Sequence, residues 1–129
     1  MTATAPTRHP FDDARVCVIG PGFSEPVMRL LGYSRWQVER IPDVKAAAAE
    51  IECGSVPVVM CGVGDWRKVV EIARRAPHPP AIIVLTDAPK DSEWAEVLKA
   101  NACYLDVNNL DAPRLFSLLN LLWRVWHNE

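Results

Sequence analysis

Residues 56–65 of the chain, with the sequence VPVVMCGVGD, decide how the rest of the sequence is interpreted. The apolar run from Val56 to Met60 predicts a buried central strand, the glycines after it predict a turn, and Asp65 predicts the cap of a helix. In an open α/β sheet, ligands and chemistry are found where strands end and turns begin. Cys61 and Gly62 occupy that place, so their identity bears directly on function.

Strand and helix patterns alternate on both sides of this stretch. Arg15–Ile19 and Ala81–Leu85 are short continuous apolar runs, which are typical of strands covered on both faces. The remaining strands are predicted at Trp36–Ile41 and Cys103–Val107, and helices are predicted to begin near Ser24, Asp43, Asp65, Asp91 and Asp111. Five alternations, with helices long enough to cross over, predict an α/β doubly wound (βα)5 domain with a parallel five-stranded sheet.

Composition places further limits on the protein. A chain of 129 residues, half of them hydrophobic, fits one globular domain, assigned to residues 15–129 after a frayed leader at residues 1–14. A net charge of −2 and the lack of a long apolar run argue against nucleic-acid or membrane binding, and without an export signal we expect a cytoplasmic protein. The four cysteines lack metal-ligand spacing, so we expect free thiols, no metal and no cofactor.

Three segments of the second half resemble the receiver domain of bacterial response regulators. They are IIVLT (residues 82–86), EVLKANACYL (residues 96–105) and DAPRL (residues 111–115), which are similar to the family's fourth strand, the segment entering its fifth strand and the start of its last helix. The resemblance implies a flavodoxin-like sheet of strand order 2-1-3-4-5 and a signal-transduction function in a two-component phosphorelay.

The resemblance also implies a phosphorylation pocket, whose residues this chain lacks. Gly20 and Pro21 stand where the family has its acidic pair, Cys61 where it has the phosphoryl acceptor, and Val107 where it has a lysine. Only Thr86 and the switch-type Tyr104 match. We therefore expect a degenerate pseudo-receiver that is not phosphorylated by the usual route. The alternative is a conventional phospho-receiver with substituted acids, although neither Asp87 nor Asp106 is well placed beside Cys61.

Three features each allow a functional and a structural interpretation. Cys61 near the start of a helix could be a redox sensor, or could fill the space of a missing aspartate. The Gly20–Gly22 turn could hold an anion or small ligand in a crevice with Cys61, or could be a remnant loop. Four basic residues on one helix could contact an acidic partner, or could form a solvated face: Arg67, Lys68, Arg74 and Arg75. The structural interpretation is favoured for each.

The last predicted helix is apolar nearly all round, which indicates a partner surface. Its candidate interface residues are Leu115, Phe116, Leu119, Trp123 and Trp126. In receivers this helix and the fifth strand belong to the usual dimerisation face. We therefore expect a protein partner, most simply a second copy of the chain, and a non-catalytic regulatory module or the N-terminal domain of a transcription regulator. No Ser-His-Asp, Cys-His or paired-carboxylate set supports an enzyme.

Overall fold

The computed structural model describes residues 14–20 and 24–127. Its strands are β1 (Arg15–Ile19), β2 (Gln37–Ile41), β3 (Val58–Gly62), β4 (Ala81–Thr86) and β5 (Cys103–Asp106). Its helices are α1 (Ser24–Leu31), α2 (Val44–Glu52), α3 (Trp66–Ala73), α4 (Asp91–Lys99), the short 3-10 helix η1 (Val107–Asn109) and α5 (Ala112–His127). All neighbouring strands are parallel, in the order β2-β1-β3-β4-β5. The predicted fold and strand order are confirmed.

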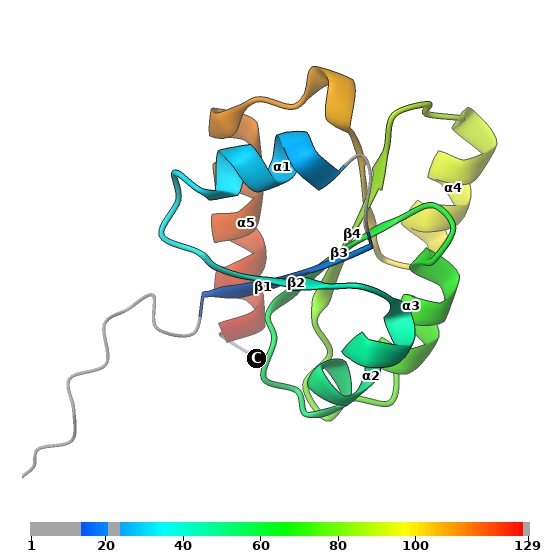
Figure 1. Ribbon diagram of the computed structural model, residues 1–129. Coiled ribbons are helices and arrows are strands. Elements are labelled where there is room, and N and C mark those ends of the chain that lie inside the picture. Colours follow the sequence, from blue (N-terminus) through cyan, green and yellow to red (C-terminus); the bar gives the residue numbers. More distant parts are fainter. Residues whose placement is uncertain (1–13, 21–23, 128–129) are drawn as a thin grey trace, which may run out of the picture.

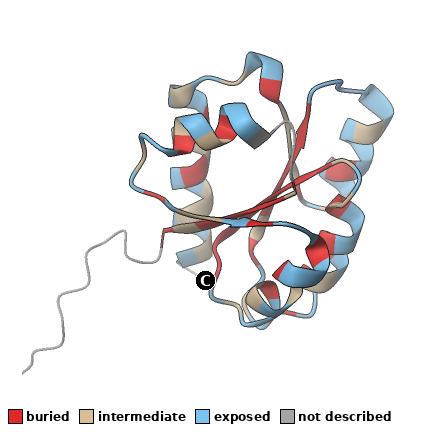
Figure 2. Cartoon of the chain, viewed as in Figure 1, coloured by how far each residue is buried: buried red, intermediate tan, exposed pale blue. Residues whose placement is uncertain are grey.

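Helices cover both faces of the sheet (Figure 1). Because successive strand residues point to opposite faces, Val58 and Met60 of β3 pack with α1 and α5, whereas Val59 and Cys61 pack with α2, α3 and α4. The interior strands are buried along their length and the outer surfaces of the helices are exposed (Figure 2). This burial on both faces explains why the interior strands are continuous apolar runs in the sequence.

The central strand lies two residues further along the chain than the sequence predicts. Pro57 has no N–H to donate, and it precedes β3, where its carbonyl accepts a hydrogen bond of 2.8 Å from Ala81 N. The strand therefore begins at Val58 and includes Cys61 and Gly62, which pair with Val84 and Leu85 of β4. Cys61 is thus part of the strand rather than of the turn that follows.

The described part of the chain begins with a residue that packs into the core. Ala14, assigned to the leader by the sequence, is fully buried, and its carbonyl accepts a hydrogen bond of 2.9 Å from Gln37 N. The rest of the predicted leader lies outside the described residues.

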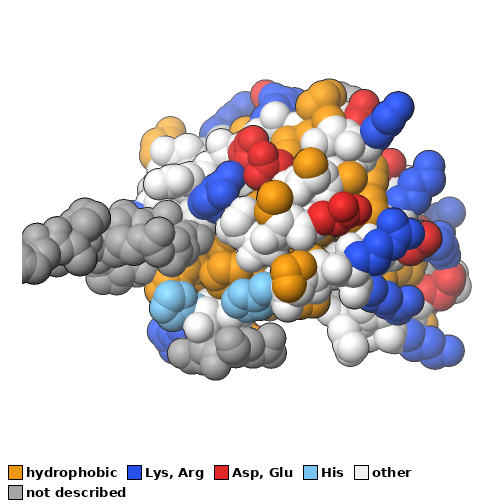
Figure 3. Space-filling model, turned by 90° about the horizontal axis from the view of Figure 1, so that it is seen from below, with side chains coloured by type: hydrophobic (Ala, Val, Ile, Leu, Met, Phe, Trp, Pro, Cys, Tyr) orange, Lys and Arg blue, Asp and Glu red, His pale blue; other side chains and the backbone are white. Residues whose placement is uncertain are grey.

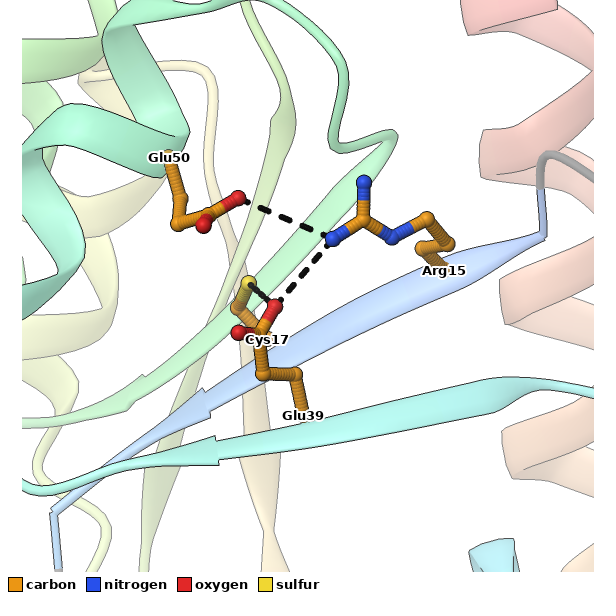
Figure 4. Close-up of polar contacts among 4 residues, drawn as sticks. All are labelled: Arg15, Cys17, Glu39 and Glu50. Carbon is orange, nitrogen blue, oxygen red and sulfur yellow. Dashed lines mark hydrogen bonds and ion pairs between the residues drawn. The ribbon is translucent and has the colours of Figure 1, made fainter.

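An ion-pair cluster fixes the start of β1 to β2 and α2. Arg15 Nη2 lies 3.2 Å from Glu39 Oε1 and 3.6 Å from Glu50 Oε2, and the Cys17 thiol donates to Glu39 at 3.8 Å (Figure 4). Burial, followed by the negative charge of Glu39, raises the pKa of Cys17 to about 12. This thiol is a neutral core group beside a partly exposed ion pair, so we assign the cluster a structural role.

Among the described residues, no helix is both long and apolar enough to cross a bilayer.

Candidate functional site

Parallel strands bring their carboxyl ends to one edge of the sheet, and this edge is the candidate site. Gly20 follows β1, Cys61 lies near the end of β3, Thr86 ends β4 and Val107 follows β5. The sequence therefore placed these four residues at the correct edge. Pro21 lies outside the described residues.

Gly20 adopts a left-handed backbone conformation, with φ of 91°, which suits glycine because other residues are strained there. Its N–H donates to the Ile41 carbonyl at 2.9 Å, so the loop after β1 is joined to the end of β2. A pocket of about 380 Å³ lies here, lined by Gly20, Arg40, Ile41 and Pro42. Cys61 does not line it, so among the described residues the predicted crevice shared by Gly20 and Cys61 is not found.

Cys61 is a core residue on the α2–α4 side of the sheet, with 1 % of its surface exposed. Burial, followed by the negative charge of Asp65, raises its pKa to about 12. A nearby helix N-terminus, on which the sensor alternative rests, would lower this pKa, but desolvation of the thiolate outweighs it. A buried thiol that stays protonated is a poor redox sensor, so the geometry supports the packing interpretation.

Asp65 lies near this edge, and the sequence analysis did not consider it as a site residue. It precedes α3, but its side chain makes no capping hydrogen bond, contrary to the prediction. Its Oδ2 lies 3.9 Å from the place where a Cβ on Gly20 would be. Its spacing of four residues from Cys61 was the signal that could have drawn attention to it.

The other two acids near the edge do not join Asp65. Asp106 caps η1, since its two oxygens accept from Asn108 N at 3.0 Å and from Asn109 Nδ2 at 2.8 Å. Asp87 is exposed, and its carbonyl accepts from the Asn108 side chain. Mg²⁺ prefers several hard oxygen ligands, and a neutral buried thiol is not one of them. Within residues 14–20 and 24–127, no cluster of three or more His, Cys, Asp or Glu side chains is placed to hold a metal ion, so the donor set does not fit Mg²⁺.

Val107 occupies the position that the resemblance assigns to a lysine, and it is buried. It packs into the α1–α5 side of the core, beside residues such as Leu85 and Leu115. Its side chain therefore contributes to folding and offers no charge to a phosphoryl group at this edge.

Thr86 and Tyr104 form a hydrogen-bonded group with the start of α4. The Tyr104 hydroxyl donates to Glu93 Oε1 at 2.6 Å and accepts from Lys90 N at 3.2 Å. Thr86 is buried, and its hydroxyl accepts from Ala88 N at 3.1 Å. Desolvation and the hydrogen bond to Glu93 raise the pKa of Tyr104, whereas its hydrogen bonds to Lys90 and Thr86 lower it. The sequence did not single out Glu93.

The last helix contributes fewer interface candidates than its sequence suggests. Leu115 and Leu119 are fully buried against the sheet, so assigning them to an interface was wrong, because the domain's own core covers them. Phe116 and Trp123 are half-buried against the same core, and Trp126 stacks on His78. The exposed large apolar residues of α5 are Leu121 and Val125.

Helix α4 adds two exposed apolar side chains. Val97 is buried in the core, whereas Trp94 and Leu98 are 51 % and 49 % exposed. Glu96, on the opposite flank of this helix, pairs with Arg67 of α3 at 2.7 Å. With 3.6 residues per turn, Trp94 and Leu98 therefore lie on the flank that faces away from α3 and toward the β5 edge.

The exposed apolar side chains of α5 also lie on one flank of their helix. Phe116 and Asn120 line a pocket with Arg35 and Trp36, on the side of α5 next to the α1–β2 connection. Leu121 and Val125 lie on the opposite flank, 56 % and 52 % exposed, and so also face the β5 edge. Apolar side chains on two helices thus border the edge strand β5.

Several solved structures of response-regulator proteins have this arrangement. The CheY4 chemotaxis protein of Vibrio cholerae is 18 % identical with a TM-score of 0.66, and the match covers 84 % of this chain and 98 % of that one. A CheY-like receiver domain from Methanospirillum hungatei is 12 % identical with a TM-score of 0.71, over 88 % and 96 % of the two chains. This chain has the receiver fold.

A two-component response regulator from Clostridium difficile is similar to the same degree, with 14 % identity, a TM-score of 0.69 and coverage of 86 % and 96 %. No protein-family model and no curated protein sequence matches the chain. The likeness is therefore one of fold, and the carboxyl edge of the sheet in this chain carries Gly20, Cys61 and Val107.

Proposed function

We propose that this chain is a non-catalytic signalling module, a pseudo-receiver that works by protein contact instead of phosphotransfer. Its fold is that of solved response-regulator receivers, which are signalling modules. Supporting the loss of phosphotransfer, Cys61 and Val107 are core residues at the acceptor and lysine positions. Asp65 is the carboxylate whose charge acts on Cys61 and whose Oδ2 approaches Gly20, and no metal-ligating cluster surrounds it among the described residues. One carboxylate is a poor site for Mg²⁺.

The contact surface in this proposal is the β5 edge, and its occupant is a second copy of the chain. The observation that carries it is the pair of apolar flanks, Trp94 with Leu98 on α4 and Leu121 with Val125 on α5, each side chain about half exposed or more. Exposed apolar side chains on both sides of an edge strand are costly to leave in water. A two-fold symmetric pairing would cover the same patch on both copies. Such a dimer suits the regulatory domain of a transcription regulator.

The test is the solution mass by light scattering over a range of concentrations. We expect a dimer, and we expect the double variant Leu121→Glu/Val125→Glu to be monomeric, because buried carboxylates are strongly disfavoured in an apolar contact. The control is Tyr33→Glu, which adds one such carboxylate at an 83 % exposed aromatic residue just after α1, away from the proposed interface. This control should remain dimeric. A wild-type monomer at every concentration, or a dimer that resists the double variant, would contradict the proposed interface.

Measuring the solution mass with and without reductant distinguishes this proposal from redox sensing. The Cys17 and Cys61 thiols are buried and Cys53 is exposed, so we expect the mass of the Cys53→Ser variant to be the same with and without reductant. A dimer that forms only under oxidation, and that Cys61→Ser abolishes while Cys53→Ser does not, would favour the sensor alternative.

A further inference from the structure

A groove runs between α3 and the turn from α4 to β5, on the side of α4 away from the proposed dimer surface. It consists of two adjoining hollows of about 370 and 230 Å³. Val70, Arg74 and Ala100 line both, so the hollows are continuous. Volumes of this size are typical of small-molecule sites.

The floor of the groove is apolar and well packed. Val70, Ala73 and Ile82 are 7 %, 4 % and 7 % exposed and belong to the α2–α4 side of the core, and Pro80 beside them is buried. The floor therefore offers a firm apolar surface to the body of a ligand, rather than a mobile loop.

Positive charge borders this floor. Lys and Arg side chains gather on the right of the view in Figure 3, the side on which α3 and α4 lie in Figure 1. Arg67 is paired with Glu96 and lies over the Trp66 ring at 4.7 Å, and Arg75 is paired with Glu71. Arg74 lines both hollows and has no ion-pair partner among the described residues. It is the cation of the rim that is available to an anion.

We propose that this groove binds a small organic anion with an apolar body. The apolar part lies on Val70, Ala73 and Ile82, and the anionic group pairs with Arg74. Glu71 and Glu96 on the rim disfavour a polyanion such as nucleic acid, whereas a single carboxylate or sulfonate next to Arg74 avoids them. The site is separate from the degenerate pocket at the carboxyl edge and from Trp94 and Leu98 on the other flank of α4, whereas Pro79 and Pro80 line both the groove and a hollow that reaches Val125.

The test uses two probes, anilinonaphthalene sulfonate and decanoate, with backbone amide shifts read by NMR. We expect both probes to shift the Val70, Ala100 and Asn101 amides, and decanol, which lacks the charge, to bind more weakly. Arg74→Ala should weaken decanoate binding about tenfold, as expected for loss of a charged hydrogen bond. The matched control Arg75→Ala removes the same charge from the next residue, which does not line the groove, and should change binding by less than about twofold.

Three results would overturn the proposal. Equal weakening by Arg74→Ala and Arg75→Ala would mean that net charge alone attracts the probe. If decanol bound as tightly as decanoate, the anionic group would not contribute to binding. Amide shifts confined to Trp94, Leu98, Leu121 and Val125 would mean that the probes bind the exposed apolar patch. Because Pro79 and Pro80 adjoin both the groove and Val125, the binding comparison is made at a protein concentration where light scattering shows the monomer, so that failure of this proposal is distinguishable from failure of the dimer proposal.

Discussion

The Tyr104 hydroxyl donates a hydrogen bond of 2.6 Å to Glu93, which ties the edge strand β5 to the first turn of α4. The Lys90 N–H donates to the same hydroxyl at 3.2 Å, so the phenol has a partner for its donor and for its acceptor. Trp94, which follows Glu93, belongs to the exposed apolar flank of α4. The position of Tyr104 and the proposed dimer surface are therefore linked through one turn of helix.

Replacing the carboxylate of Glu93 should change the pKa of Tyr104. Burial and the hydrogen bond to Glu93 raise the pKa of Tyr104, so Glu93→Gln should lower it. Near-ultraviolet absorbance in a Tyr33→Phe background isolates the Tyr104 phenol, since the chain has two tyrosines. Glu96→Gln is the control, because Glu96 pairs with Arg67 instead. Because folding raises the pKa of Tyr104, the protonated phenol stabilises the fold at pH values below the unfolded-state pKa. That stabilisation is lost as the pH rises through the folded-state pKa. An unchanged titration in Glu93→Gln would refute the link.

Thiol labelling should distinguish the four cysteines. Cys53 is exposed, Cys17 and Cys61 are buried with pKa values of about 12, and Cys103 is half-buried with a raised pKa. We expect Ellman's reagent at neutral pH to modify Cys53 rapidly and the other three only on unfolding. Cys53→Ser should remove the rapid phase. Rapid native-state labelling of Cys61 would contradict its burial and revive the sensor interpretation.

A small-molecule phosphodonor should leave the chain unmodified. With phosphoramidate and Mg²⁺ we expect no stable mass increase, because Cys61 is a buried neutral thiol and Asp65 is a single carboxylate. Intact-protein mass spectrometry checks this. An adduct that Asp65→Asn abolishes would make Asp65 a relocated acceptor and would overturn the pseudo-receiver proposal, whereas an adduct retained in that variant would point to Asp87 or Asp106.

Truncating two leucines of α5 should change the free energy of unfolding by very different amounts. Leu119 is fully buried, so Leu119→Ala should lower the free energy of unfolding by about 2–5 kcal/mol. Leu121 is 56 % exposed, so Leu121→Ala should change it by about 0.5 kcal/mol or less. Urea denaturation at low protein concentration, where the monomer prevails, measures both. Similar losses for the two variants would mean that α5 is rotated from the orientation described.

The end of α5 should depend on His78. Its ring stacks on Trp126 with centroids 4.0 Å apart and an interplanar angle of 1°, and its Nε2 donates to the Trp126 carbonyl at 2.7 Å. His78→Ala removes both contacts and should speed amide exchange in the last turn of α5 about fivefold, as expected for about 1 kcal/mol. His127→Ala removes a looser stack on Trp123, at 4.9 Å, and should have a smaller effect. Equal effects would show that the link to His78 is not what holds this turn.

The element order and the two-faced sheet could be read from the sequence because each depends on local pattern. Continuous apolar runs such as Ala81–Leu85 indicate a strand buried on both faces, and Asn101, with φ of 61°, ends α4 as an asparagine suits. The predicted boundaries of β3 were less accurate, because the strand begins after Pro57. The edge position of Gly20, Cys61, Thr86 and Val107 followed from the parallel topology.

What the sequence by itself determined is therefore the set of elements, their order and the residues available at the carboxyl edge, since periodicity and strand direction are properties of local sequence. Tertiary structure alone decided which apolar residues remain exposed. Leu115 and Leu121 are both leucines on one apolar helix, but the sheet covers the first and leaves the second in water. It also decided that Glu93 meets Tyr104 and that Arg74 borders an apolar floor. Those relations depend on how helices pack across the sheet, because contacts between distant segments carry no periodic signal in the chain.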